Sequence, residues 1–318
     1  MTSRESLKIF DYEHLAKPVA MNYVDVFPEN NLYGLSYQLR RYIGDDEKKR
    51  MKTLCYVEHG LYMGDYVNWF SYNYSEIRKV VTFGDFREKV LNSHLEFSQR
   101  HIPILKIGPY IHYSFSLLKE QEKREIKETF GKILLVFPSH SVAKIGNVTY
   151  DIDAFCKEID YVKSKISCDS VFVCMYWKDV EDDQCCKIYE SHGFKIVCAG
   201  HKNDYLFMSR LKSIIELADY TMSNEVGTNL GYCIYMGKPH YVYQQKIGWD
   251  DGDDVFMKRQ NMSSESFHSF DSVKAEIVSF FSESPTTITE KQRKIVDYYW
   301  GLNNVKTPEE LKKELIIQ

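Results

Sequence analysis

The sequence predicts an α/β protein with two parallel β-sheets, each covered by helices on both faces. Short apolar runs alternate with helical stretches of about 10 to 15 residues, an alternation typical of parallel strands joined by crossover helices. The alternation occurs in two sets, and a highly charged run at residues 119–131 separates them. At 318 residues with 44% hydrophobic content, the chain is long enough for two domains, each with its own core.

The first domain is expected at residues 1–118, and the charged run 119–131 is expected to form a connecting helix. The hydrophobic pattern predicts three strands and two helices within this domain. The strands are expected at residues 53–58, 79–82 and 104–107, and the helices at residues 33–42 and 85–99.

The second domain is expected at residues 132–285, followed at residues 286–318 by helices that pack back toward the first domain. Thr307 and Pro308 mark the start of the last helix, because Thr is a good N-cap and Pro fits the first helical position. The strands are expected at residues 133–137, 170–175, 195–198, 220–222 and 241–243, and the helices at residues 151–165, 184–192, 206–218, 228–236, 271–282, 289–300 and 308–317.

Residues 218–243 have the pattern strand, glycine turn, helix, strand. A helix that begins at Gly227 and Thr228 directs unpaired N–H groups and a positive dipole end into the turn, which favours an anion such as a diphosphate. An ordinary crossover with a capped helix fits the same pattern, so both interpretations are open. The turn also contains small side chains that form hydrogen bonds: Ser223, Asn224 and Asn229.

Composition argues against several classes of protein. The net charge of −4 and the pI near 6.2 do not suit a binder of duplex nucleic acid, which needs a clustered basic face. No apolar run approaches the roughly 20 residues of a membrane span, and the first eight residues lack the apolar segment of a signal peptide, so we expect a cytoplasmic protein. The eight cysteines contain no CxxC pair and are expected to be reduced. The acidic loop at residues 250–254 is expected to be solvated, with Mg²⁺ or Mn²⁺ at its paired carboxylates as the open alternative. No metal and no cofactor is predicted.

Six motifs stand in order along the chain, at residues 57–60 and 107–113 in the first domain and at residues 133–141, 198–201, 207–212 and 223–232 in the second. They resemble motifs of GT-B glycosyltransferases from bacterial capsule and lipopolysaccharide biosynthesis. The resemblance extends over roughly residues 53–243 and implies two Rossmann-like domains that face each other across a cleft. It implies a nucleotide-sugar donor on the C-terminal domain and an acceptor on the N-terminal domain. The His-Gly pair within residues 57–60 is also similar to that of polyol-phosphate transferases.

The resemblance also implies a donor site. It places the donor diphosphate at Gly227, Thr228 and Asn229, without a metal, where the helix dipole and side chains stabilise the leaving group. The chain departs from the family pattern in one respect: the acidic residue that clamps the donor ribose in many such domains is not evident, unless Glu225 takes its place. The remaining donor-side candidates are Ser139, His140 and Ser141 on the facing loop, Arg210 as an added positive charge, and Ser223 and Asn224 in the turn.

Glycosyl transfer needs a base to take the proton of the acceptor hydroxyl. His59 is the first candidate, because it follows an apolar strand and imidazole titrates near neutral pH; a structural role for it is also open. Glu58 and Asp65 are alternates, and strand alternation predicts that Glu58 and His59 point opposite ways, so that only one faces the cleft. Tyr110 and His112 are acceptor-side candidates, and His112 either lines the acceptor site or packs at the interdomain hinge.

These inferences predict a metal-independent glycosyltransferase that moves a sugar to a surface glycan or a lipid-linked glycan. A polyol-phosphate (CDP-glycerol-like) transferase, a UDP-sugar epimerase and a non-catalytic scaffold of a polysaccharide assembly complex are the alternatives. An aromatic run at residues 62–74 either faces the inner side of the cytoplasmic membrane or packs within a loop. The nucleotide, sugar, acceptor, stereochemical outcome and oligomeric state are left open by the sequence.

Overall fold

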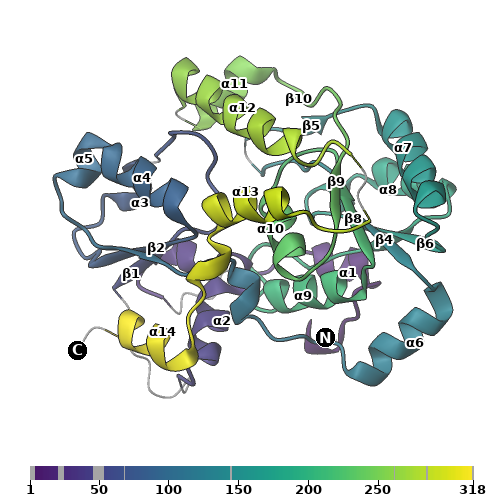
Figure 1. Ribbon diagram of the computed structural model, residues 1–318, viewed down its shortest axis with the longest axis horizontal. Coiled ribbons are helices and arrows are strands. Elements are labelled where there is room, and N and C mark those ends of the chain that lie inside the picture. The colour runs from purple at the N-terminus through teal and green to yellow at the C-terminus, as the bar shows by residue number, and fades with distance from the viewer. Residues whose placement is uncertain are drawn as a thin grey trace.

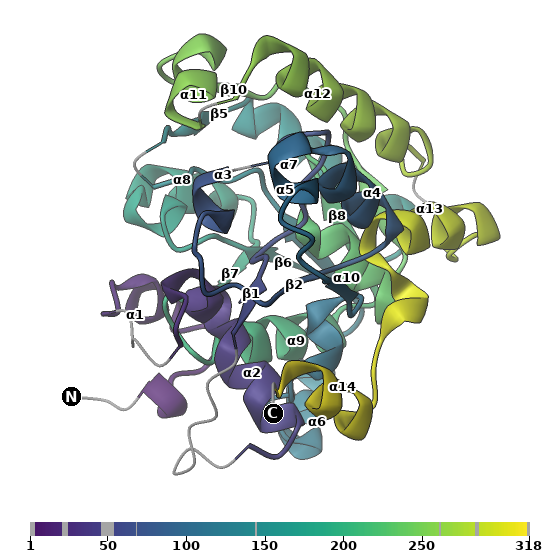
Figure 2. The same cartoon turned by 90° about the vertical axis from the view of Figure 1, so that its left-hand side faces the viewer.

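The computed structural model describes residues 4–20, 25–45, 54–67, 69–143, 145–260, 262–283 and 286–316. Two parallel sheets lie side by side, one of three strands and one of five, with helices around both (Figures 1 and 2). The predicted α/β class with two Rossmann-like parallel sheets is confirmed. No helix in the described parts of the chain combines the length and apolar character needed to cross a bilayer.

The first unit contains the sheet β1-β2-β3, in which both strand pairs are parallel. The helix predicted at residues 85–99 is broken at His94, whose extended backbone ends α4 and begins α5. The elements are η2 (Pro28–Gly34), α2 (Leu35–Tyr42), β1 (Cys55–Val57), α3 (Trp69–Tyr72), β2 (Lys79–Thr82), α4 (Asp85–Ser93), α5 (Leu95–Ser98), β3 (Ile104–Lys106) and η3 (Tyr110–Tyr113). Residue 53, where the first strand was expected to begin, lies outside the described residues.

The second unit contains the sheet β7-β6-β4-β8-β9, whose central strand β4 is buried along its whole length. Numbered in chain order, these five strands run 3-2-1-4-5, the Rossmann order, and the order reverses between β4 and β8. Ligands of such sheets bind outside the carboxyl ends of the strands at this switch point. The elements are β4 (Ile133–Phe137), α7 (Ile152–Lys165), β6 (Ser170–Cys174), η4 (Asp179–Glu181), α8 (Asp183–Ser191), β7 (Lys195–Val197), α9 (Phe207–Leu217), β8 (Tyr220–Ser223), α10 (Thr228–Tyr235) and β9 (His240–Val242).

Further helices join the two units. The linking helix α6 (Glu120–Phe130) lies between them in the chain, and α11 (Asp253–Gln260) and α12 (Ser264–Ser279) follow the small antiparallel pair β5 (Val148–Thr149) and β10 (Gly248–Trp249). The C-terminal helices α13 (Glu290–Trp300) and α14 (Pro308–Leu315) flank η5 (Leu302–Asn304) and return to the first unit (Figure 1). There the Lys79 ammonium pairs with Glu314 at 2.7 Å. One apolar core runs from α2 and β2 through α9 and α10 to α13 and α14, so the units share their packing.

The N-terminal segment lies against the second unit, although the sequence places it at the start of the first. It contains η1 (Arg4–Ser6) and α1 (Tyr12–Ala16). The N–H of Cys198 donates to the carbonyl of Ile9 at 3.0 Å, and the N–H of His201 donates to that of Leu15 at 2.9 Å. These bonds join residues about 190 positions apart, which no local sequence pattern reveals.

Gly231 of α10 lies directly under the ring of Trp300 from α13. A Cβ at this position would lie 2.2 Å from Trp300 Cδ1, and the Trp300 indole N–H donates to the carbonyl of Thr228 at 3.0 Å. Gly231→Ala is therefore expected to lower the free energy of unfolding by about 1–3 kcal/mol, the usual cost of overpacking. Urea denaturation measures this, and unchanged stability would show that the indole moves aside at no cost.

Candidate functional site

Two loops at the switch point are tied together by Asn224. The backbone N–H of Ser139, after β4, donates to Asn224 Oδ1 at 2.6 Å, and the Ser139 hydroxyl donates to the same oxygen at 3.0 Å. Asn224 follows β8 and is only 3% exposed. The geometry therefore holds both loops at the carboxyl edge where the Rossmann order predicts a ligand.

Buried amide groups at this edge have no partner among the described residues. The Nδ2 atoms of Asn224 and Asn229 and both amide atoms of Gln245 are buried and make no hydrogen bond within the described parts of the chain. Asn229 lies in the first turn of α10, and Gln245 follows β9. An unpaired buried donor costs about 1–3 kcal/mol, and a ligand oxygen would satisfy it.

The helix α10 begins at this same place. Its N-cap, Gly227, makes no side-chain cap bond, although its carbonyl accepts the N–H of Leu230 at 3.1 Å, so no side chain of that residue covers the positive dipole end. A Cβ on Gly227 would lie 2.6 Å from Asn229 Oδ1, so the glycine lets the Asn229 amide lie close to the helix start. Helix N-terminus and unpaired amide donors together suit a phosphate group.

The first unit reaches this helix start through the loop after β1. The N–H of Leu61 donates to Thr228 Oγ1 at 3.0 Å, which places His59, two residues earlier, at the junction of the two units. The His59 ring lies 6.2 Å from that of Tyr33 and 5.8 Å from that of Tyr62. Burial lowers the pKa of His59 and Lys202 lowers it further, although Glu58 opposes the shift. The imidazole is therefore neutral at pH 7 and able to accept a proton.

Tyrosines that the sequence analysis missed connect His59 to the second unit. The hydroxyls of Tyr33 and Tyr176 lie 3.3 Å apart, and the ring of Tyr176 lies 4.2 Å from that of the exposed His140. Tyr176 directly follows the predicted strand 170–175, so the same rule that selected His140 would have found it. Tyr33 has a φ of 57°, an uncommon value for tyrosine, and carries no such signal.

Ser141 shapes the loop after β4. Its N–H donates to the carboxylate of Asp179 at 3.1 Å, and its hydroxyl accepts from the N–H of Val148 at 3.1 Å. Burial raises the pKa of Asp179, and its bond to Ser141 opposes this shift. Ser141 therefore holds the loop in place, while Ser139 binds Asn224 at the switch point.

The structure corrects the choice of Glu58 as an alternate base. Glu58 is fully buried and forms an ion pair with Arg87 at 2.7 Å. It also accepts hydrogen bonds from Thr82 Oγ1 at 2.5 Å and from the Tyr72 hydroxyl. All of these partners belong to the first unit, so Glu58 points into its interior and only His59 approaches the second unit.

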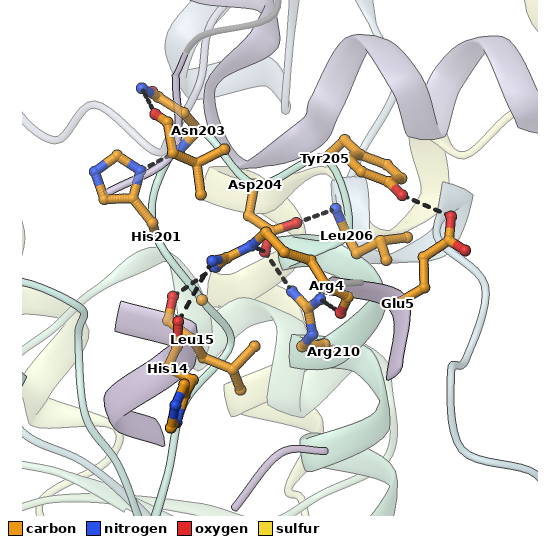
Figure 3. A network of polar contacts seen from close by, with 12 residues as sticks. Arg4, Glu5, His14, Leu15, His201, Asn203, Asp204, Tyr205, Leu206 and Arg210 are labelled. Carbon is orange, nitrogen blue, oxygen red and sulfur yellow. Dashed lines mark hydrogen bonds and ion pairs between the residues drawn. The ribbon is translucent and has the colours of Figure 1, made fainter. Parts of the chain in front are cut away.

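The structure also corrects the prediction that Arg210 adds positive charge to the donor site. Its guanidinium is 1% exposed and donates to the carboxylate of Asp204 at 2.8 Å and to the carbonyl of Arg4 at 2.7 Å. Asp204 also accepts from Arg4 at 2.7 Å, and Figure 3 shows the two arginines on either side of it. Arg210 thus fastens the N-terminal segment and is not available to a donor phosphate.

Ser223 and Glu225 shape the loop after β8. The Ser223 hydroxyl donates to the carbonyl of Glu225 at 2.7 Å and lies 3.0 Å from His240 Nε2, and burial lowers the pKa of His240 to about 3. The Glu225 carboxylate forms an ion pair with Lys274 of α12. Ser223 therefore stabilises the loop, and a ribose clamp by Glu225 would have to compete with Lys274.

Asp65 and Tyr110, two further candidates, lie in structural settings. Asp65 is exposed, and its N–H donates to Ser269 Oγ at 3.1 Å. Tyr110 is buried and stacks on Phe83 with ring centres 4.2 Å apart, so the prediction that Tyr110 contacts an acceptor is wrong.

His112 bridges two helices at the junction of the units. It lies between the hydroxyl of Tyr42 on α2, at 3.0 Å, and that of Tyr235 on α10, at 2.6 Å. These contacts agree with the interpretation in which His112 packs at the hinge between the units. Burial lowers the pKa of His112, so the imidazole is neutral in this setting.

One surface cavity lies away from these loops, and another lies beside the later residues of the loop after β4. One of about 410 Å³ lies at the amino end of β8 beside Lys132 and Arg293, and one of about 340 Å³ lies between Asn147 and Arg259. Neither is lined by a residue of the candidate site. Within the described ranges, no three His, Cys, Asp or Glu side chains lie close enough together to hold a metal ion. In the acidic loop, Asp250 accepts from Asn147 and Asp251 pairs with Arg259.

No protein-family model matches the chain, and no characterised protein matches it in sequence. Among solved structures, it is similar to a UDP-GlcNAc 2-epimerase from Neisseria meningitidis bound to UDP-GlcNAc. The identity is 11% and the TM-score 0.34, with 91% of this chain and 80% of the epimerase chain covered.

Proposed function

We propose that the chain binds a nucleotide sugar at the carboxyl edge of the five-stranded sheet and transfers its sugar to an acceptor hydroxyl. The observation that carries this proposal is Asn224, which is buried, binds Ser139 through Oδ1 and has no partner for Nδ2 among the described residues. The first turn of α10, which has no capping side chain at Gly227, and Asn229 Nδ2, which also has no partner in the described parts of the chain, add further donors at the same edge. These groups suit the oxygens of a diphosphate.

The proposed reaction uses groups from both units. His59 takes the proton of an acceptor hydroxyl, the resulting oxygen attacks the anomeric carbon, and the bond between that carbon and the phosphate oxygen breaks. Tyr62 lies 3.5 Å from His59 Nδ1, so Nε2 accepts the proton when Nδ1–H points to the Tyr62 oxygen. The charge left on the nucleotide is stabilised by the N-terminus of α10 and the amides of Asn224 and Asn229.

Nucleotide binding is the first test. One member of a panel of UDP, GDP, CDP, CMP and dTDP is expected to stabilise the chain by about 2.7 kcal/mol at 100 times its dissociation constant. Asn229→Ala is expected to weaken that binding about tenfold, because it removes a hydrogen bond to a charged oxygen. Asn303→Ala is the control, since Asn303 lies beside Tyr235 at the other end of α10.

A flat panel in thermal denaturation would refute the nucleotide-sugar proposal and favour a scaffold. Product analysis then identifies the reaction among enzymes that share a phosphate site. A released nucleotide together with a glycosylated acceptor supports glycosyl transfer. Epimerised donor without any acceptor, or CMP released with transfer of a polyol phosphate, would replace it.

A further inference from the structure

Lys202 is a half-buried cation at the junction of the two units. It follows β7, and its carbonyl accepts the N–H of Tyr33 from the first unit at 2.6 Å. Its ammonium lies 6.0 Å from the centre of the Trp177 ring. The Lys202 ammonium forms no hydrogen bond or ion pair within the described ranges. Other partly buried lysines do: Lys127 pairs with Asp219, and Lys274 pairs with Glu225.

The carboxylates around this junction already have cationic partners. Glu58 pairs with Arg87, Asp204 pairs with both Arg4 and Arg210, and Glu181 pairs with Lys178 at 2.5 Å. The Lys202 carbonyl binds Tyr33, whose ring lies 6.2 Å from that of His59. The charge of Lys202 lowers the pKa of His59, although burial has the larger effect and Glu58 opposes it. The junction therefore carries a positive charge that no side chain in the described residues neutralises.

Lys202 and α10 follow strands that are well separated in the five-stranded sheet. β7 and β8 are separated by β6 and β4 in the sheet, which makes three strand spacings, or about 14 Å at ~4.8 Å each. The loops that follow these strands extend from the same edge, with Tyr176 and His140 in the loops after the two strands between. A diphosphate bound at α10 would not bridge this distance, but a diphosphate together with its attached sugar would.

We propose that Lys202 forms a second anion subsite facing His59, and that the substrate carries a carboxylate or phosphate in addition to the phosphates at α10. This inference rests on the proposed function for the identity of the substrate. The bound anion would lie beside His59 and would favour the protonated imidazole that forms when His59 accepts a proton. Lys202 would then contribute to specificity for an acidic sugar or an acidic acceptor.

The test follows the His59 imidazole by NMR while inorganic phosphate replaces chloride at constant ionic strength, with His59→Gln assigning the signal. A saturable shift is expected in the wild type. It is expected to vanish in Lys202→Met and to persist in Lys195→Met, because Lys195 is exposed at the amino end of the same strand. The absence of a shift would overturn the proposal. A shift that persists in Lys202→Met would also overturn it, because phosphate would then be acting from α10.

A matched pair of donors identifies the source of the anion. UDP-glucuronate and UDP-glucose differ only at the sugar carbon that carries the carboxylate. Tighter binding of UDP-glucuronate, by about tenfold and lost in Lys202→Met, assigns the anion to the donor sugar. Without that preference, the anion is assigned to the acceptor. If no nucleotide binds but phosphate still acts through Lys202, the subsite stands and the nucleotide-sugar proposal fails.

Discussion

His59→Ala is expected to lower turnover by about a hundredfold to ten-thousandfold, the usual contribution of a general base, while the affinity for the nucleotide changes little. The imidazole lies where the loop after β1 meets the start of α10, and the loop is held there by the bond from Leu61 to Thr228. The nucleotide contacts proposed here all come from the second unit. Removing the imidazole therefore removes the base without removing a phosphate ligand.

The pH profile provides a second readout of His59. Burial and Lys202 lower its pKa, Glu58 raises it, and the rings of Tyr33 and Tyr62 are its other titratable neighbours. A base must be deprotonated, so activity is lost as pH falls through the lowered pKa. The acidic limb of kcat/KM is thus expected below pH 6.5 in the wild type and absent in His59→Ala. His268→Ala, on α12, is the control, and normal turnover of His59→Ala would remove His59 from the mechanism.

Glu58→Gln is expected to destabilise the first unit by about 3–5 kcal/mol, because it leaves the Arg87 guanidinium buried without its carboxylate. Arg87 is 1% exposed and also donates to the carbonyl of Tyr66 at 2.7 Å. Burial acts to lower the pKa of Arg87, but Glu58 and Tyr72 raise it above its ordinary value. The network therefore joins β1, β2, α3 and α4 and fixes the loop that carries His59.

Chemical denaturation and thermal melting measure this loss, with a fall in melting temperature of roughly 2 °C for each kcal/mol. Glu290→Gln is the control, because Glu290 forms an exposed pair with Lys294 and is expected to change stability by less than about 0.5 kcal/mol. A Glu58→Gln protein that unfolds like the wild type but has lost activity would instead identify Glu58 as the base.

Local pattern was sufficient for the strands of both sheets and for most of their helices. Each strand is a short apolar run, and the predicted ranges agree with the observed ones within about two residues. The break at His94 escaped prediction, since residues 85–99 continue without proline or glycine. The choice of Asn224, Thr228 and His59 also followed from local pattern, because parallel strands bring the residues after their carboxyl ends to one edge.

The sequence by itself determined the α/β class, the two sets of strands and the glycine turn before α10, because these depend on periodicity and on turn residues close together in the chain. Only the tertiary structure decided which polar side chains are free. Glu58 and Arg210 matched the motifs as well as His59 did, yet their partners Arg87 and Asp204 bury them. Ion pairs and hydrogen bonds between distant residues carry no periodic signal. The pairing of Asn224 with Ser139, and the lack of a partner for the Lys202 ammonium within the described residues, therefore emerge only when the chain is folded.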